Sequence, residues 1–187
     1  MTLSPSEMAR TLADGLEAAA IPYAVGGALA LGVWAFPRAT LDVDLNVFVP
    51  IEDLPQVFDV LETAGCKVAR ERALTQAASD GYFEAYAGPM RIDVFVPSIP
   101  FYDNVRRRIR QATLEGRPAW YLSPEDLAVM KLLFFRPKDL LDLERLVALR
   151  ADLDRRYVER AIESLLGAGD SRLREWNALL ERVDAQG

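Results

Sequence analysis

Two aspartates, Asp42 and Asp44, stand two residues apart in a stretch where polar and apolar residues alternate. This alternation predicts a β-strand, and residues i and i+2 of a strand point to the same side, so both carboxylates should share one face. A third aspartate, Asp93, stands in a second alternating stretch. Aspartate is depleted in strands, and neighbouring carboxylates repel each other unless a cation or a proton lies between them. The three residues therefore indicate a site for a hard metal ion that also binds phosphate oxygens.

A glycine pair, Gly26-Gly27, lies upstream, between a short apolar run and a helical stretch. Glycine allows positive φ and a close approach to a ligand, and the free N–H groups at a helix start attract phosphate. Arg38 and Thr40 are further candidates for phosphate contact, although Arg38 could equally pair with a neighbouring acid. A phosphate-binding turn beside two carboxylates is what metal-dependent nucleotidyl transfer requires, with Mg²⁺ or Mn²⁺ activating the attacking hydroxyl and stabilising pyrophosphate. The alternative is an ordinary turn followed by a half-exposed strand whose aspartates face water.

A second group of charged residues follows in the last third of the chain. Lys131 lies in an otherwise apolar helical stretch, 127–135. Its ammonium either reaches water along the helix surface or points at a phosphate. Asp139 and Asp142 are three residues apart near the next helix start, so they are neighbours on its surface. The helix dipole favours acids at that position, which leaves a structural role as open as a functional one.

The elements that must position these residues follow from the apolar periodicity. Helices are expected over 5–20, 28–35, 53–65, 101–109, 124–135, 137–150, 154–166 and 171–183. Strands are expected over 21–25, 40–49, 66–70, 82–87, 90–96 and 111–114. Strands dominate the first two thirds and helices the last third, which predicts an α+β fold with a mixed β-sheet core and flanking helices. We expect residues 1–120 to form the sheet core and 121–187 a C-terminal helical region packed on it.

The bulk composition narrows the possible functions. The chain has 187 residues, which suits one domain or one domain with a small helical appendage. Histidine is absent, which excludes imidazole-dependent triads and histidine metal sites. The single cysteine, Cys66, allows no internal disulfide and fits a reducing compartment. There is neither a run of about 18 apolar residues nor a signal-peptide pattern at the N-terminus, so we predict a cytoplasmic protein without a membrane partner.

Taken in order, these motifs resemble those of the DNA polymerase β-like nucleotidyltransferase superfamily. That family has a Gly-Gly or Gly-Ser turn, a helix, an Asp-x-Asp pair and a later strand acid. The matching residues here are Gly26, Gly27, Asp42, Asp44 and Asp93. The segment 123–142 is similar to the lysine and Lys-Asp-x-x-Asp segment of small bacterial members, including the AbiE-type abortive-infection toxins. The resemblance covers roughly residues 20–145.

The resemblance implies an enzyme that moves a nucleoside monophosphate from a nucleoside triphosphate to an acceptor. Asp42, Asp44 and Asp93 would bind Mg²⁺ or Mn²⁺, and Asp93 would be a candidate for the base. Lys131 would reach the nucleotide phosphates, and Asp139 would support that lysine or the acceptor. The expected nucleotide-binding residues are Gly26, Gly27, Arg38, Thr40 and Lys131.

The acceptor is left open by the sequence. A toxin-like member would modify tRNA, and a basic cluster could hold an RNA backbone. The cluster comprises Arg106, Arg107, Arg108, Arg110 and Arg117. The same arginines could instead form a solvated helix face, and the net charge of −6 disfavours a general nucleic-acid binder.

Two further hypotheses compete with an RNA-modifying enzyme. An aminoglycoside-type enzyme would need an acidic pocket for a cationic substrate, which the negative net charge weakly favours. A non-catalytic module would keep the fold to bind a nucleotide or a partner as one half of a toxin–antitoxin pair, with an antitoxin as its partner. The presence of both Asp42 and Asp44 argues against the module.

Overall fold

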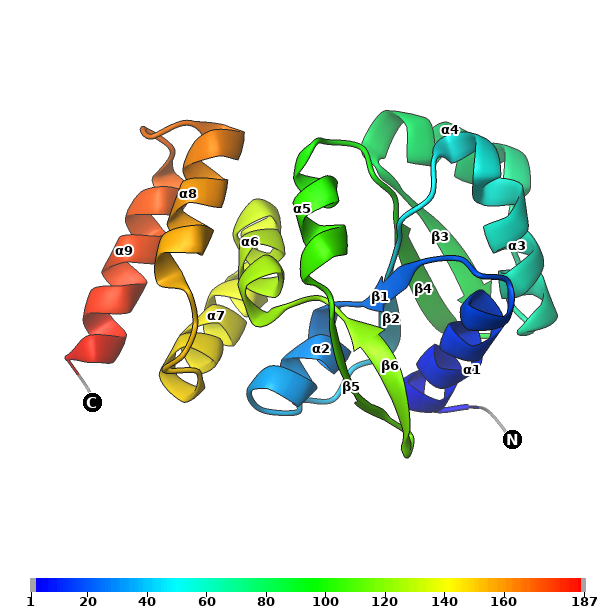
Figure 1. The fold of residues 1–187 in the computed structure, drawn as a ribbon, viewed down its shortest axis with the longest axis horizontal. Helices are drawn as coiled ribbons and strands as arrows, with labels where there is room; N and C mark the ends of the chain where they lie inside the picture. Colours follow the sequence, from blue (N-terminus) through cyan, green and yellow to red (C-terminus); the bar gives the residue numbers. More distant parts are fainter. Residues whose placement is uncertain (1–2, 186–187) are drawn as a thin grey trace. The chain divides into compact units, whose positions relative to one another are not determined.

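The computed structural model describes residues 3–185, whose elements Figure 1 colours along the chain. The contacts between Cα atoms divide the chain into two compact units. The first, here called the sheet unit, contains the residues up to 29 and residues 38–122. The second, here called the helical unit, contains residues 30–37 and those from 123 onward. Helix α2 (Gly27–Trp34) begins in the sheet unit and continues into the helical unit.

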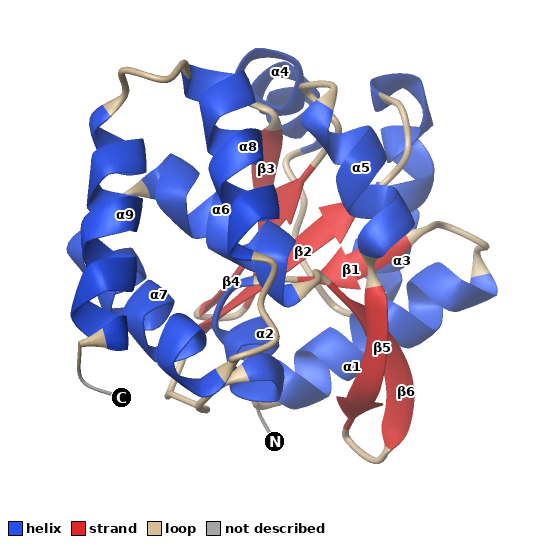
Figure 2. Ribbon diagram, turned by 60° about the vertical axis from the view of Figure 1, so that its left-hand side comes forward, coloured by secondary structure: helices blue, strands red, loops and turns tan. Residues whose placement is uncertain are grey.

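A mixed six-stranded sheet organises the sheet unit. Its spatial order is β3-β4-β2-β1-β6-β5, with β2 parallel to β4, β1 parallel to β6 and the other neighbours antiparallel. The strands are β1 (Tyr23–Val25), β2 (Asp42–Val47), β3 (Tyr82–Ala87), β4 (Met90–Phe95), β5 (Arg110–Leu114) and β6 (Arg117–Tyr121). Figure 2 shows them in red, with β5 and β6 side by side as a hairpin. The predicted α+β class with a mixed sheet is confirmed.

One face of this sheet forms the core of the unit. Val43 and Leu45 of β2 and Ile92 of β4 are fully buried, as their alternation with polar residues predicts. Phe58 of α3 meets Phe83 of β3 edge-on at a centroid distance of 5.2 Å, so α3 covers this face. The helices of the unit, besides the start of α2, are α1 (Pro5–Ala18), the 3₁₀ turn η1 (Ile51–Asp53), α3 (Leu54–Thr63), α4 (Arg70–Asp80) and α5 (Phe101–Arg108).

Up to residue 185, the helical unit contains the end of α2 and four further helices. They are α6 (Pro124–Phe134), α7 (Pro137–Leu149), α8 (Arg155–Leu166) and α9 (Ser171–Asp184), close to the predicted bounds. Helix α6 begins where the sequence predicts, because the hydroxyl of Ser123 accepts a hydrogen bond from the Asp126 amide at 3.1 Å. Trp176 of α9 is fully buried and anchors the core of the unit. No helix within residues 3–185 is long and apolar enough to cross a membrane.

Two segments differ from the sequence prediction. The expected strand 66–70 is wrong: Lys67 makes an isolated bridge to Tyr86, and α4 follows at once. Helix α4 was not predicted because it lacks a strong apolar stripe: only Ala73 and Ala77 are buried on its inner side. Strand β6 was not predicted, because a proline such as Pro118 argues against a strand. That proline is tolerated because β6 meets β1 only at its last residue, Tyr121.

The single cysteine gives a direct test of this core. Cys66 is 5% exposed, and burial raises the pKa of its thiol to about 11. At pH 8 the thiolate should therefore be at least about a hundredfold scarcer than in the unfolded chain. We expect a disulfide reagent such as dithiobis(2-nitrobenzoate) to label Cys66 of the native protein at least about a hundredfold more slowly than Cys66 of the protein unfolded in 6 M guanidinium. Equal labelling rates would show that the thiol is accessible.

Candidate active site

The three predicted aspartates lie on one face of neighbouring strands. Strands β2 and β4 are parallel, and their register places Asp44 opposite Asp93 and Asp42 opposite Arg91. Strand β3 extends the first of these rows by placing Glu84 opposite Asp93. Residues that stand opposite each other in a sheet share a face, so this face collects charged groups from three strands. We call it the acid face, and its residues are Asp42, Asp44, Glu84, Tyr86, Arg91 and Asp93.

An arginine lies among the acids of this face. The Nη2 atom of Arg91 is 3.0 Å from Oδ2 of Asp93 and 3.4 Å from Oδ2 of Asp42. Its Nη1 atom is 4.0 Å from Oε1 of Glu84. Neither Arg91 nor Glu84 was predicted from the sequence as a site residue. Arg91 and Asp93 are two residues apart on one strand, so the sequence alone could have indicated that both side chains lie on the acid face.

Asp93 is the most buried acid of the face. The residue is 9% exposed, and its Oδ1 atom has no hydrogen-bond partner among the described residues. Burial raises the pKa of its carboxyl above the usual aspartate value; Asp42 and Glu84 add to this rise, while Arg91 opposes it. A carboxylate that is costly to keep charged has an increased affinity for a proton or a cation. These properties are compatible with the predicted role of Asp93 as a general base or a metal ligand.

The glycine pair meets the acidic strand directly. The amide of Gly26 donates a hydrogen bond to the carbonyl oxygen of Asp44 at 2.9 Å. Gly27 has φ +52°, and a Cβ placed on it would overlap the carboxyl group of Asp44. Asn46, which was not predicted from the sequence, is 1% exposed. Its Nδ2 atom would lie 3.0 Å from a Cβ placed on Gly26. The turn is thus shaped by side chains of β2, and at position 27 only glycine fits without displacing the carboxyl group of Asp44.

The loop before β2 supplies two more of the predicted residues. The hydroxyl of Thr40 donates a hydrogen bond to the carboxylate of Asp42, which it helps to orient. Arg38 donates from Nη1 to the carbonyl of Ala39 at 3.3 Å, within its own loop. Both residues belong to the sheet unit together with the acid face.

The remaining predicted residues lie in the helical unit. The ammonium of Lys131 is 2.6 Å from Oδ2 of Asp142 and 3.7 Å from Oδ1 of Asp139. Asp139 also accepts a hydrogen bond from Nε of Arg136 at 2.7 Å. The side chain of Lys131 is only 5% exposed. The structure therefore places Asp139 beside this lysine, and the role of Lys131 at the nucleotide phosphates stays a prediction.

The oxygen donors of the acid face are of the kind that Mg²⁺ or Mn²⁺ binds. Within residues 3–185, however, no group of three or more acidic or cysteine side chains is placed to hold a metal ion by itself. Mg²⁺ typically uses one or two carboxylates and completes its shell with water and substrate phosphates. The unpartnered Oδ1 of Asp93 and the contact between Gly27 and Asp44 fit such a shared site. The assignment of Asp42, Asp44 and Asp93 as ligands remains a prediction.

The contact between the glycine turn and Asp44 can be tested by adding one methyl group at Gly27. Gly27→Ala should destabilise the protein by about 2–3 kcal/mol, because the new side chain requires positive φ and displaces the carboxyl of Asp44. Gly88→Ala is a matched control, since Gly88 has φ +61° and nothing within 4 Å of the added carbon. It should cost only about 1 kcal/mol. Urea denaturation measures both values, and equal costs would contradict the contact with Asp44.

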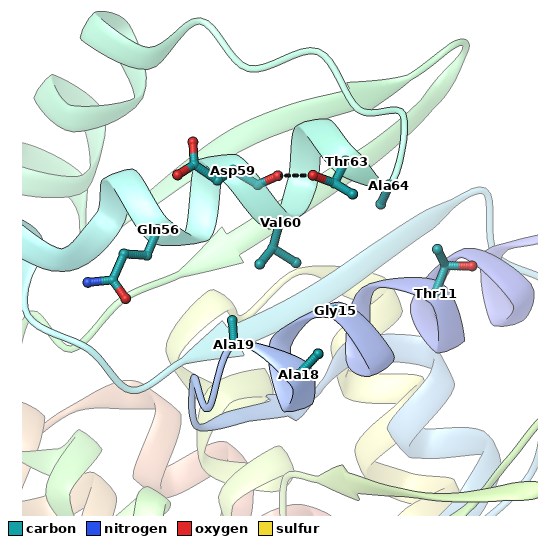
Figure 3. Close-up of a pocket in the computed structure, with 9 residues that line it drawn as sticks. All are labelled: Thr11, Gly15, Ala18, Ala19, Gln56, Asp59, Val60, Thr63 and Ala64. Atoms are coloured by element: carbon teal, nitrogen blue, oxygen red, sulfur yellow. Dashed lines mark hydrogen bonds between the residues drawn. The ribbon is translucent and has the colours of Figure 1, made fainter.

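A separate cavity lies away from these groups. It has a volume of about 560 Å³ between α1 and α3, the helices behind the buried face of the sheet (Figure 3). Its lining is mostly apolar, with Gly15, Ala18 and Val60 among its residues. The hydroxyl of Thr63 is used within α3, where it donates to the carbonyl of Asp59 at 2.7 Å. None of the predicted site residues lines this cavity.

Comparisons with known proteins agree with the fold. Residues 16–182 match the model of a family described as a nucleotidyltransferase of unknown function, DUF6036. Among solved structures, the antibiotic-resistance factor ANT(2'')-Ia is 17% identical, with a TM-score of 0.65 and full coverage of both chains. The lincosamide antibiotic adenylyltransferase LnuA is 15% identical, with a TM-score of 0.53, covering 76% of this chain and 96% of its own.

A third structure is an antigenic nucleotidyltransferase-like protein from Paracoccidioides brasiliensis. It is 15% identical, with a TM-score of 0.53, and the match covers 95% of this chain and 92% of that protein. No curated protein matches the sequence significantly. At these identities the solved structures bear on the fold alone.

Proposed function

The chain belongs to the DUF6036 family of nucleotidyltransferases, and from this premise we propose that it transfers a nucleoside monophosphate from a nucleoside triphosphate to an acceptor hydroxyl. One observation carries the proposal: Asp44 and Asp93 stand opposite each other on parallel strands, and the Gly26-Gly27 turn touches Asp44. If the turn binds phosphate, this arrangement would bring the phosphate next to two carboxylates within one unit.

Each group of site residues would have a separate role in the reaction. The amides at the start of α2, which begins at Gly27, would hold phosphate oxygens. The acceptor oxygen would attack the α-phosphorus, its proton would pass to the Asp93 carboxylate, and the bond to the β-phosphate oxygen would break to release pyrophosphate. Bound by Asp42, Asp44 and Asp93, Mg²⁺ or Mn²⁺ would neutralise the developing charge. The protein's contribution is positioning and electrostatic stabilisation.

Transfer can be tested with labelled nucleotides. The purified protein would be incubated with each α-³²P-labelled nucleoside triphosphate, Mg²⁺ and one of three acceptor pools: total RNA, a mixture of antibiotics, or a small-molecule cell extract. We expect label on one pool, with pyrophosphate released and EDTA abolishing transfer. Binding of nucleotide without transfer to any pool would instead identify a non-catalytic binding module.

RNA is one acceptor class that a surface feature favours. Arg106 and Arg107 are exposed in the last turn of α5, and Arg110 is exposed at the start of β5. Arg108 belongs to the same cluster and is half-buried. Exposed cations in one region attract a phosphate backbone, and the resulting binding weakens steeply with salt. A toxin that modifies tRNA and is held by an antitoxin would be a specialised form of this proposal.

A small-molecule acceptor is the competing proposal. It is supported by the fold shared with the antibiotic-resistance factor ANT(2'')-Ia and the adenylyltransferase LnuA. The two proposals differ in one measurable property, because only the RNA acceptor should lose label when Arg106→Gln and Arg107→Gln are combined. Equal loss of transfer to both acceptor classes would show that these arginines act on folding or on the nucleotide.

A further inference from the structure

A polar pocket lies beside the acid face, at the outer edge of strand β3. Its volume is about 340 Å³. Glu84 and Tyr86 of β3 form one wall, and residues before and within α4 form the other. The residues that line it are Lys67, Val68, Ala69, Arg72, Ala73, Gln76, Glu84 and Tyr86.

The backbone pairing shows that this pocket adjoins the acid face. The amide of Lys67 donates to the carbonyl of Tyr86 at 2.7 Å, and the amide of Tyr86 donates to the carbonyl of Lys67 at 3.1 Å. Residues that exchange both hydrogen bonds stand opposite each other, and their side chains share one face. Tyr86 in turn stands opposite Arg91, so Lys67 extends the row of residues that reaches Asp42.

The charges of the pocket are not balanced. Glu84 accepts a hydrogen bond from the hydroxyl of Tyr86 at 2.7 Å and lies 4.0 Å from Arg91, so its carboxylate already has partners. The side chains of Lys67 and Arg72 make no hydrogen bond or ion pair with any residue between 3 and 185. Two cations without partners among the described residues thus line the pocket, with the side-chain amide of Gln76 as a further donor. This set of donors matches the oxygens of a phosphate group.

The position of the pocket relative to the candidate base suggests its role. Glu84 stands opposite Asp93, and neighbouring strands are about 4.8 Å apart, so the pocket begins one strand beyond Asp93. The glycine turn lies on the other side of Asp93, next to Asp44. A nucleotide bound by the turn and an acceptor bound in the pocket would therefore approach Asp93 from opposite sides.

We propose that this pocket binds the acceptor of the transfer reaction and selects an acceptor that carries a phosphate group, an inference that rests on the proposed function. Lys67 and Arg72 hold the phosphate, and the acceptor hydroxyl extends toward Asp93. The phosphate belongs either to a terminal nucleotide of RNA or to a small phosphorylated sugar.

Two probes that differ only in a phosphate test the pocket. Ribose 5-phosphate and ribose would be titrated separately into ¹⁵N-labelled protein without nucleotide or metal. We expect ribose 5-phosphate, but not ribose, to shift the amide resonances of residues 67–73 and 84–86. The double variant Lys67→Gln/Arg72→Gln should raise its dissociation constant by at least about tenfold, since each lost hydrogen bond joins two charged groups. Equal shifts with both probes, or an unchanged dissociation constant, would overturn the proposal.

The control variant removes the same charge elsewhere. Arg156→Gln/Arg160→Gln changes two exposed residues of α8 in the helical unit and should leave the dissociation constant unchanged. A short single-stranded RNA with a free 3′ hydroxyl is the second probe. If it binds the pocket more tightly than ribose 5-phosphate, the phosphate belongs to RNA; the reverse order assigns it to a small molecule, and either order supports a phosphate site.

The readouts separate the two proposals. Probe binding is measured without nucleoside triphosphate, so it does not depend on whether transfer occurs. Phosphate binding at the pocket without transfer to any acceptor would contradict the proposed function. Transfer that proceeds with an unchanged acceptor KM in Lys67→Gln/Arg72→Gln would leave the proposed function standing and would remove the pocket from it.

Discussion

Asp44→Asn is expected to reduce the rate of nucleotidyl transfer by about a thousandfold or more. Asparagine keeps the shape of the side chain but removes the charge that would bind the metal ion. The loss corresponds to about 4 kcal/mol of transition-state stabilisation. Folding should be preserved within about 1 kcal/mol, because asparagine has nearly the same shape and the position is only half-buried. Steady-state kinetics with the identified acceptor and urea denaturation measure the two effects.

A matched variant shows whether the effect belongs to the site. Asp80→Asn removes the same charge from an exposed position at the end of α4 and should leave transfer unchanged. Mn²⁺ binding gives a second readout: electron paramagnetic resonance should show weaker binding to Asp44→Asn than to Asp80→Asn. A fully active Asp44→Asn variant would remove Asp44 from the reaction and contradict the metal assignment.

Asp142→Asn is expected to lower the free energy of unfolding by about 3 kcal/mol. The ammonium of Lys131 is 2.6 Å from Asp142 and almost fully buried. Within residues 3–185, the substitution leaves this cation with Asp139, at 3.7 Å, as its one remaining acidic partner. Breaking one side of a buried ion pair typically costs about 3–5 kcal/mol, and the nearby Asp139 places this case at the lower end. Urea denaturation followed by circular dichroism gives the value.

Two further variants complete this test. Glu175→Gln breaks the more exposed pair between Arg182 and Glu175, 3.1 Å apart, and should cost no more than about 1 kcal/mol. The double variant Lys131→Met/Asp142→Leu removes both buried charges together and should recover most of the stability lost in Asp142→Asn. If Asp142→Asn were no more destabilising than Glu175→Gln, the buried pair would contribute nothing specific to the helical unit.

The agreement between sequence and structure is closest where the pattern is local. Ser123 and Pro124 mark the start of α6, because a hydroxyl cap and a proline at the first position are determined within a few residues. The alternation around Asp42 predicts β2 for the same reason. The failure at α4 has the opposite cause: its inner side buries only alanines, so its helical conformation depends on packing against β3 and α3.

The candidate site shows the same division. Asp42 and Asp44 could be placed on one side of a strand from their spacing, since side chains alternate along any strand. That Asp93 stands opposite Asp44 depends on the register of two strands about fifty residues apart, which no local pattern contains. The guanidinium of Arg91 among the acids follows from that register as well.

The sequence by itself determined the residue types, their alternation and the order of turn, acid pair and later acid, and these were enough to indicate phosphate chemistry. Only the tertiary structure decided that Gly27 touches Asp44, that Glu84 and Arg91 join the acid face, and that Lys67 extends it toward a pocket. The physical reason is the distance along the chain over which each feature is determined. Backbone conformation and side-chain alternation arise within a few residues, whereas strand pairing depends on which apolar faces the whole chain can bury together.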